Sequence, residues 1–140
     1  MNIGIFFTHD YSLKSWHETG TLDKELKIYR NLSNKHNVNF VFYTYGDSED
    51  IKILPNETGM KVFPIYDKFK RYNNKYLRLL LTFFLPFRIK KYTKDIDIIQ
   101  QHQLAGVWVS LMIKFLNKKP FFIRTGYDTY QFSLNENKPY

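Results

Sequence analysis

Two groups of polar residues in the second half of the chain have side chains of the types that bind substrates. Gln100–Gln103 comes directly after the apolar pair Ile98–Ile99, and Arg124–Asp128 comes directly after the apolar run Phe121–Ile123. An arginine can bind a phosphate or carboxylate through two parallel hydrogen bonds. A glutamine amide can both donate to and accept from a hydroxyl group. These residue types favour recognition of a polar or anionic ligand.

Both groups also have a purely structural interpretation. Gln101, His102 and Gln103 can form the turn that precedes a helix. Arg124 can form an ion pair with Asp128 that only holds the loop in shape. We favour ligand contact for Gln101 and Gln103, with His102 directed to the opposite side by the alternation of a strand. We also favour function for the second group, whose candidate residues are Arg124, Gly126, Tyr127 and Asp128.

A third polar stretch, Thr8–Gly20, is predicted to be a long loop and holds two histidines and two carboxylates, at His9, Asp10, His17 and Glu18. Such side chains can bind a metal or transfer protons. Their spacing matches no metal site, so we predict none. A solvated loop is the favoured interpretation of any one of them, and of the four we expect ligand contacts from His17 and Glu18.

Gly20 and Thr21 open a helical pattern that ends at Asn37. The start of a helix presents free backbone N–H groups and the positive end of the helix dipole, so it is a natural anion site. An ordinary loop glycine is the alternative interpretation of Gly20. Thr21 is the expected N-cap of the helix. The chain has no Gly-x-Gly-x-x-Gly motif, so the pattern does not indicate a dinucleotide site.

Short apolar runs alternate with helical patterns along the whole chain, and this alternation is typical of an α/β domain with a parallel sheet. We therefore predict one Rossmann-like domain over residues 1–140, a parallel sheet flanked by helices. Ligands of such sheets bind outside the carboxyl ends of the strands, where the polar groups fall. The predicted strands are Ile3–Phe7, Val38–Thr44, Met60–Ile65, Ile98–Ile99 and Phe121–Ile123, with a short edge strand at Ile51–Leu54 and helices after Thr21, within Asn73–Lys94 and over Leu104–Leu116.

The positive charge of the chain is concentrated in one segment. The net charge is +8, and Lys68–Lys94 contains nine lysines and arginines without one acidic residue. With its aromatic residues, the segment can rest on an anionic membrane surface. A solvated helix that packs its apolar face on the sheet is the alternative. Nucleic-acid binding ranks well below both, because no nucleic-acid-binding motif accompanies the charge. The apolar part is shorter than the ~20 residues of a membrane span, and Pro86 is expected to break or kink its helix.

Three blocks of the sequence resemble the N-terminal domain of GT-B glycosyltransferases of the family 4 type. The first is Gly20–Leu32, in which Lys24-Glu25 stands where such enzymes have an Arg-Glu pair. The second is Tyr43–Gly46, at the end of the second strand. The third is Arg124–Asp128, similar to an Arg-x-Gly-Tyr-Asp sequence that follows the fifth strand in one branch of the family. Many members carry a histidine at the end of that strand, where this chain has Ile123–Gly126 without one.

The resemblance implies the acceptor-binding half of a two-domain enzyme that moves a sugar from a nucleotide-sugar to a hydroxyl acceptor. The acceptor would be a glycan or a lipid-linked molecule in cell-surface polysaccharide synthesis. A donor-binding C-terminal domain would lie outside this sequence, so we expect residues 1–140 alone to turn over no donor. No metal and no cofactor besides the donor substrate is implied. The expected catalytic residues are Arg124 and Asp128, and the expected acceptor or donor contacts are His17, Glu18, Gly20, Thr21, Gln101, Gln103, Gly126 and Tyr127.

We expect a cytoplasmic protein that associates with a membrane surface. The N-terminus lacks the basic region and cleavage site of a signal peptide, and a chain without cysteine is compatible with a reducing compartment. The main alternative is a non-catalytic binding module that docks to a separate donor-binding chain or to the membrane surface. A stand-alone nucleotide-binding α/β domain ranks lower, and we expect no nucleic-acid partner.

Overall fold

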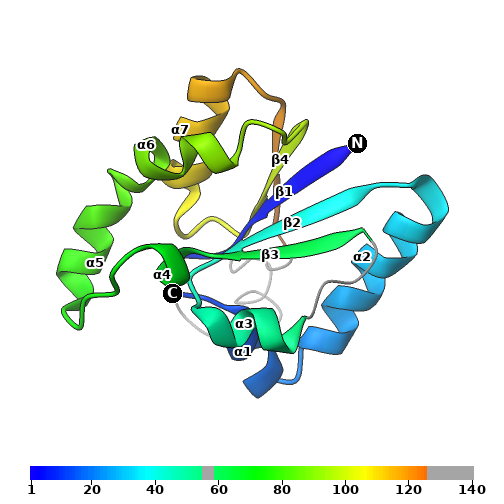
Figure 1. Cartoon of the computed structure of the whole chain (residues 1–140), viewed down its shortest axis with the longest axis horizontal. Helices are drawn as coiled ribbons and strands as arrows, with labels where there is room; N and C mark the ends of the chain where they lie inside the picture. The colour runs from blue at the N-terminus through cyan, green and yellow to red at the C-terminus, as the bar shows by residue number, and fades with distance from the viewer. Residues whose placement is uncertain (55–58, 126–140) are drawn as a thin grey trace, which may run out of the picture.

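Five apolar segments form the strands of one parallel sheet in the computed structural model, which describes residues 1–54 and 59–125 (Figure 1). The sheet has the order β3-β2-β1-β4-β5, and each pair of neighbouring strands is parallel. The predicted α/β fold, a Rossmann-like parallel sheet flanked by helices, is confirmed. The strands are β1 (Asn2–Phe6), β2 (Asn39–Thr44), β3 (Met60–Pro64), β4 (Ile98–His102) and β5 (Phe121–Arg124).

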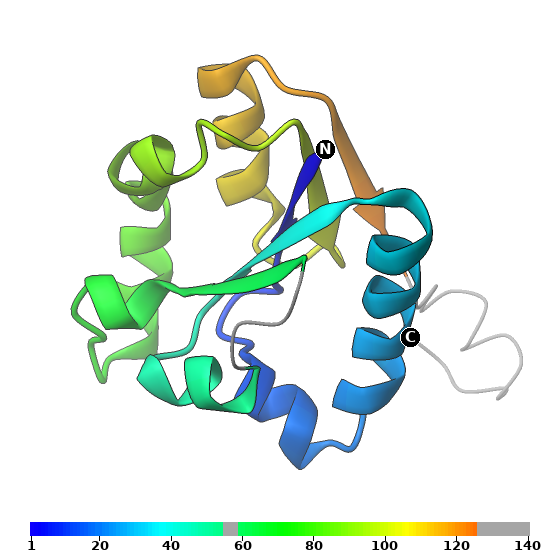
Figure 2. The ribbon, with the colours of Figure 1, turned by 45° about the vertical axis from the view of Figure 1, so that its right-hand side comes forward.

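Helices cover both faces of the sheet (Figure 2). One apolar core lies between the sheet and α1 and α2, and a second lies between the sheet and α6 and α7. The connections from β1 to β2 and from β2 to β3 both run along the face of the sheet that α1 and α2 cover. The chain crosses to the other face between β3 and β4. The helices are α1 (Leu13–Glu18), α2 (Leu22–His36), α3 (Ser48–Ile53), α4 (Ile65–Lys68), α5 (Lys75–Thr82), α6 (Leu85–Ile89), the 3₁₀ helix η1 (Lys90–Tyr92) and α7 (Val107–Asn117).

The central strand β1 is apolar on both faces because both faces are covered. Ile5 is fully buried in the first core, where it packs with Phe42 of β2. Phe6 belongs to the second core, where its ring stacks on Tyr43 with centroids 4.6 Å apart. Alternate side chains of a strand point to opposite faces, so a strand buried on both sides is a continuous apolar run.

Residues 13–18 form helix α1 where the sequence predicted an extended polar loop, so that prediction is wrong. The Ser12 hydroxyl accepts from the Ser15 N–H at 3.1 Å, and the Ser15 hydroxyl accepts from the Ser12 N–H at 3.3 Å. Leu13 and Trp16, one turn apart, are buried in the first core. The reciprocal cap and the buried pair stabilise a helix that is too short to form alone.

The predicted edge strand Ile51–Leu54 is also wrong, because residues 48–53 form helix α3. The Asp47 side chain begins this helix by accepting from the Glu49 N–H at 2.9 Å. A side-chain cap of this kind favours the helical start over an extended conformation.

Asp50, within α3, is a buried carboxylate that joins three segments. It is only 1% exposed. Its oxygens accept from the N–H groups of Leu13 and Lys14, at 3.2 and 3.0 Å, and from the Thr44 hydroxyl at 2.5 Å. Asp50 therefore caps the start of α1 and ties both α1 and α3 to the end of β2. Nothing in the sequence pattern indicated this role.

The connection from β3 to β4 is divided into short helices. Helix α5 ends at Thr82 and α6 begins at Leu85, with Pro86 in the first turn of α6. A proline is tolerated there because the first turn needs no backbone donor, so the predicted break falls just before the proline. Helix α7 begins at Val107 rather than Leu104, because Gly106 adopts a left-handed backbone (φ 90°). Among the residues described, no helix combines the length and apolar composition needed to cross a bilayer.

Candidate functional site

The carboxyl ends of the five parallel strands lie along one edge of the sheet. At the centre of this edge, the loop after β1 leads to the face of the sheet that α1 covers, and the loop after β4 leads to the face that α7 covers. Two hydrogen bonds join these loops: the Thr8 hydroxyl donates to the His102 carbonyl oxygen at 2.9 Å, and the His9 N–H donates to the Ala105 carbonyl oxygen at 3.0 Å. Open α/β sheets bind ligands where such loops diverge. Two polar clusters lie at this edge.

The first, which we call the arginine–glutamate cluster, consists of Arg124, Glu25, Tyr29 and His102. The Arg124 guanidinium, at the end of β5, donates to Glu25 Oε2 at 2.5 Å and Oε1 at 3.4 Å, and to the Tyr29 hydroxyl at 3.4 Å. His102 Nε2 lies 3.8 Å from Glu25 Oε2. Glu25 and Tyr29 are one turn apart on α2, so a single helix face orients the arginine.

Burial and hydrogen bonding together set the protonation of the arginine–glutamate cluster. It lowers the pKa of His102 despite the opposing charge of Glu25, so the imidazole is neutral near pH 7. Burial alone would lower the pKa of Arg124 as well, but the hydrogen bonds to Glu25 and Tyr29 outweigh it and the pKa is raised. The cluster therefore holds a charged guanidinium, paired with the Glu25 carboxylate, beside a neutral imidazole.

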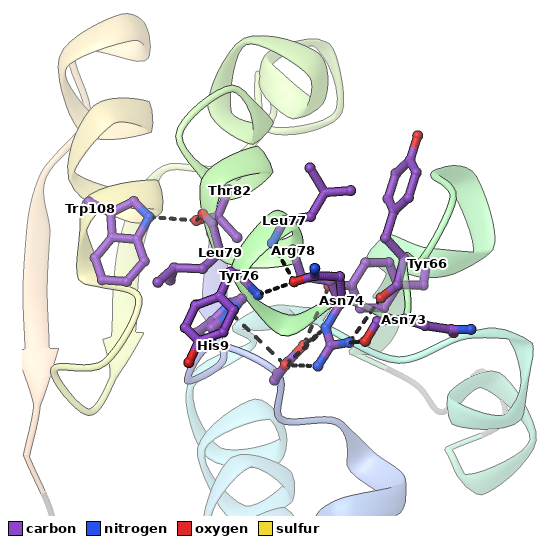
Figure 3. Close-up of polar contacts among 12 residues, drawn as sticks. His9, Tyr66, Asn73, Asn74, Tyr76, Leu77, Arg78, Leu79, Thr82 and Trp108 are labelled. Carbon is purple, nitrogen blue, oxygen red and sulfur yellow. Dashed lines mark hydrogen bonds and ion pairs between the residues drawn. The ribbon is translucent and has the colours of Figure 1, made fainter.

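The second, which we call the aspartate–arginine cluster, consists of Asp10, Arg78, Tyr66 and His9; the last three are labelled in Figure 3. Asp10 follows β1 with a left-handed backbone (φ 62°). Arg78, on α5, donates to Asp10 Oδ2 from Nη2 at 2.7 Å and from Nε at 3.1 Å. Its Nη1 donates to two carbonyl oxygens of the preceding turn at 2.9 and 3.0 Å. The Tyr66 hydroxyl lies 3.4 Å from Asp10 Oδ1. Arg78 thus connects α5 to the loop that follows β1.

The charges of this cluster oppose the effect of burial on Asp10. Burial alone would raise the pKa of Asp10, but the hydrogen bond from Arg78 and the charges of His9, Arg78 and Arg71 hold it below its ordinary value. Burial lowers the pKa of His9. His9 Nδ1 is buried without a hydrogen-bond partner among the described residues, and Nε2 lies 4.0 Å from Asp10 Oδ2. Near pH 7 the cluster pairs a charged carboxylate with a neutral imidazole.

A polar pocket of about 240 Å³ opens beside the aspartate–arginine cluster, between α1 and the loops after β1 and β2. Charged side chains of both signs line it, so it suits a ligand with several hydroxyl groups better than a purely apolar one. Its lining includes Asp10, Ser12, Ser15, Glu18, Tyr66 and Arg71.

The residues predicted from the sequence fall into different parts of this edge. Glu18 lines the polar pocket. Gln103 is exposed at the end of β4, and its N–H donates to the Arg124 carbonyl oxygen at 3.1 Å. His102 points to the opposite face of β4 from Gln101, as the alternation of a strand predicts, and there it lies with Arg124 in the arginine–glutamate cluster.

Gln101 serves the fold. Its side chain has no exposed surface. Its Oε1 accepts from the Ser110 hydroxyl at 2.6 Å, and its Nε2 lies 3.4 Å from the Phe7 carbonyl oxygen and 3.3 Å from its neighbour's. Because these groups satisfy the amide inside the second core, Gln101 is not available to a sugar hydroxyl, contrary to our expectation.

At the start of α2, the backbone N–H groups of Gly20 and Thr21 already have acceptors within the chain. The Gly20 N–H donates to the His17 carbonyl oxygen and the Thr21 N–H to the Trp16 carbonyl oxygen, at 3.1 and 3.0 Å. These two donors are therefore occupied by the last turn of α1. Thr21 holds the N-cap position, but its hydroxyl makes no capping hydrogen bond. His17 is exposed on α1.

Gly126, Tyr127 and Asp128 lie outside the described residues, so their predicted roles remain predictions. Sequence reasoning missed the parts played by Glu25 and Arg78. The only local signal for Glu25 was its place in the Gly20–Leu32 block. Arg78 was visible only as the single charge in an apolar run.

Stability is expected to fall on acidification because His9 and His102 are held neutral. In the unfolded chain a histidine has its ordinary pKa of 6.5, and in the fold both values are lower. The unfolded chain therefore binds protons first, so the contribution is complete above that ordinary value and is lost as the pH falls through the window below it. Urea unfolding from pH about 8 to about 5 should show this slope.

His102→Gln is expected to flatten that slope, whereas His36→Gln, at an exposed position on α2, should leave it unchanged. An identical slope in His102→Gln and the wild type would contradict the assignment for His102.

No family model, no curated protein and no solved structure matches this chain. Among the described residues, no group of three or more histidine and carboxylate side chains is arranged to hold a metal ion. The candidate site is therefore defined by its own geometry, which consists of the two clusters and the polar pocket at the carboxyl edge.

Proposed function

We propose that this chain is the acceptor-binding, N-terminal half of a GT-B type glycosyltransferase, which moves a sugar from a nucleotide-sugar to a hydroxyl acceptor. One observation carries the proposal. Arg124 and Glu25, which are 99 residues apart, form an ion pair at the carboxyl edge. They belong to two of the three blocks that resemble this family, and the third block, Tyr43–Gly46, ends β2 at the same edge.

The side chains at this edge suit recognition of an acceptor. A guanidinium has five N–H donors, and Arg124 makes three hydrogen bonds within the described residues. It can therefore donate to a ligand oxygen while Glu25 holds its orientation. Gln103 supplies an exposed amide, and Glu18 adds an acceptor in the polar pocket. Together they provide both donors and acceptors for sugar hydroxyl groups.

The donor-binding half would contribute the other part of the reaction. The bond from the anomeric carbon to the diphosphate must break as the acceptor oxygen bonds to that carbon, and stabilising the departing charge is the main electrostatic task. We assign that task to a second domain or a separate chain. The same proposal places the reaction in the cytoplasm, a reducing compartment with which a chain without cysteine is compatible.

Nuclear magnetic resonance titration of the isotope-labelled chain tests this proposal, with methyl glycosides as acceptor probes and nucleotide-sugars as donor probes. We expect methyl glycosides to shift the signals of Gln103, Arg124 and Glu18, and nucleotide-sugars to leave them unchanged. Arg124→Lys keeps the charge but loses the two-pronged donor geometry, so it should weaken binding about tenfold. Lys27→Met, exposed on α2, is the matched control.

Two results would contradict the proposal. Shifts at the carboxyl edge with nucleotide-sugars alone would indicate a stand-alone nucleotide-binding domain. Sugar transfer by these 140 residues without any other chain would show that no separate donor-binding half is needed.

A further inference from the structure

Large apolar side chains are concentrated on the outer surface of α5 and α6. Within residues 1–54 and 59–125, seven of the seventeen exposed large apolar residues lie between positions 76 and 87. Three of them, Tyr76, Phe84 and Phe87, are 71%, 59% and 58% exposed. Single exposed apolar residues are ordinary, but a cluster of this size marks an interaction surface. We call it the α5–α6 surface, and it consists of Tyr76, Leu77, Leu79, Leu80, Phe83, Phe84 and Phe87.

The surroundings of the α5–α6 surface are strongly basic. Residues 68–94 contain nine lysines and arginines and no acidic residue. Among the described residues, only two of the nine form ion pairs, Lys68 with Asp67 and Arg78 with Asp10. Six of the other seven are exposed and can face an external anionic partner: Lys70, Arg71, Lys75, Arg88, Lys91 and Lys94. Apolar side chains with flanking cations are the composition of a segment that lies in a membrane interface.

Helix α5 is held away from the sheet, where a flat partner can reach it (Figure 1). Few contacts attach it to the body. Arg78 binds Asp10, and the Trp108 indole N–H donates to the Thr82 hydroxyl at 2.9 Å (Figure 3). The Phe83 ring stacks on Trp108 with centroids 5.5 Å apart. These contacts use one side of the helix and leave most of its leucines exposed.

We propose that the α5–α6 surface docks on an anionic lipid membrane, with Leu80, Phe84 and Phe87 inserted at the interface and the flanking lysines and arginines on the lipid phosphates. Charge complementarity selects this occupant. A second copy of the chain would bring two basic surfaces together, which like-charge repulsion disfavours. Single-stranded nucleic acid stacks its bases on aromatic rings, but it gains little from leucines such as Leu77, Leu79 and Leu80.

The inference does not depend on sugar transfer, since it uses only the exposure and charge of α5 and α6. It has a geometric consequence for the candidate site. Arg78 lies on α5 and also belongs to the aspartate–arginine cluster. Docking of this surface would therefore bring the carboxyl edge of the sheet close to the membrane.

Co-sedimentation with lipid vesicles tests the proposal. The chain is expected to bind mixed phosphatidylcholine–phosphatidylglycerol vesicles and to bind phosphatidylcholine vesicles far more weakly, with binding reduced by salt. The combined variant Leu80→Ser, Phe84→Ser and Phe87→Ser should reduce binding by about tenfold or more. Phe115→Ser, which removes an aromatic side chain that is 70% exposed on α7, should leave binding unchanged.

Two double lysine-to-glutamine variants test the electrostatic contribution to vesicle binding. Each cation near an anionic surface contributes about fivefold to partitioning, so Lys75→Gln with Lys91→Gln should weaken vesicle binding by more than about tenfold. Lys24→Gln with Lys27→Gln, exposed on α2, removes the same charge elsewhere and should have little effect. Circular dichroism would establish that each variant is folded.

Several results would overturn the proposal. One is equal binding of the wild type to neutral and anionic vesicles. Another is a loss of vesicle binding in the control variants as large as the loss in the α5–α6 variants. Tighter binding to single-stranded RNA, abolished by the same serine variants, would assign the surface to nucleic acid. A dimer detected by light scattering and lost in the serine variants, without vesicle binding, would assign it to self-association.

Discussion

Replacing Asp50 with alanine is expected to lower the free energy of unfolding by about 3–4 kcal/mol, the largest effect of any single substitution considered for this chain. The carboxylate is buried and accepts three hydrogen bonds, from the N–H groups of Leu13 and Lys14 and from the Thr44 hydroxyl. Alanine leaves these donors without a partner, at about 1–3 kcal/mol for each one that remains buried. Urea unfolding monitored by circular dichroism measures the loss.

Asp47→Ala is the matched control, because Asp47 is also a helix-capping aspartate in the same segment. Its side chain accepts one hydrogen bond, from the Glu49 N–H, and it is exposed. Loss of an N-cap of this kind costs about 1 kcal/mol. Equal losses in the two variants would contradict the role assigned to Asp50 and would indicate that both aspartates act only as ordinary caps.

Gly46 provides an independent check on the same carboxylate. A Cβ atom at Gly46 would lie 2.1 Å from Asp50 Oδ2, closer than any real contact. Gly46→Ala is therefore expected to be strongly destabilising, by about 2–3 kcal/mol. In the Asp50→Ala background the obstructing oxygen is absent, so the same substitution should cost much less. Additive losses in this double-mutant cycle would contradict the close approach of the two residues.

The main elements of the fold could be predicted because they depend on a pattern that the sequence carries locally. Strands of a sheet covered on both faces are continuous apolar runs, as in β1 and β2, and a long amphipathic helix such as α2 is periodic. Asn37, predicted to end α2, does so in a left-handed conformation (φ 51°). Such features depend on neighbours within a few residues.

Helices α1 and α3 escaped prediction because tertiary contacts and caps decide them. Helix α1 is only six residues long, and its reciprocal cap uses Ser15 where the familiar pattern has Glu or Gln. Ile51–Leu54 is apolar apart from Lys52 and suits a short strand, and only the cap by Asp47 and the burial of Asp50 make its first three residues part of a helix. Short apolar runs do not distinguish helix from strand.

The candidate site was predicted only in outline, since its contacts join distant segments. The carboxyl edge and the end of β5 at Arg124 follow from the strand positions. The partner of Arg124 does not, because Glu25 is 99 residues away. Gln101 shows the same limit, since only the packing of α7 on β4 puts Ser110 against its amide and buries it.

Replacing Arg78 with methionine is expected to release α5 from the body of the domain. Arg78 connects the helix to Asp10 through Nη2 and Nε and also holds the turn before the helix through two carbonyl oxygens. Hydrogen exchange of the backbone amides in residues 75–82 should become about tenfold faster or more. The global free energy of unfolding should fall by about 1–2 kcal/mol, because the ion pair is at the edge and partly exposed.

Lys75→Met is the matched control for this change. Lys75 is a cation on the same helix, and its ammonium group lies over the exposed Tyr76 ring at 5.1 Å rather than against the body of the domain. Its replacement should change stability by no more than about 0.5 kcal/mol and leave exchange in residues 75–82 unaltered. Faster exchange in both variants would mean that α5 depends on general charge rather than on the contact of Arg78 with Asp10.

The pairing with Asp10 can be tested by a double-mutant cycle and by pH. Arg78→Met and Asp10→Asn should each remove the same interaction, so their combined effect should fall short of the sum by about 1 kcal/mol or more.

The pKa of Asp10 in the fold lies below its ordinary value of 3.8, so the unfolded chain binds the proton first as the pH falls. The pairing therefore stabilises the fold fully above that ordinary value and is lost as the pH falls through the folded pKa. In the wild type, the protection of the α5 backbone amides against hydrogen exchange should decline in that acidic window. In Arg78→Met this protection should already be low at pH about 7 and should change little on acidification. A wild-type helix that stays protected below the folded pKa of Asp10 would show that other contacts, such as the stacking of Phe83 on Trp108, suffice to hold it.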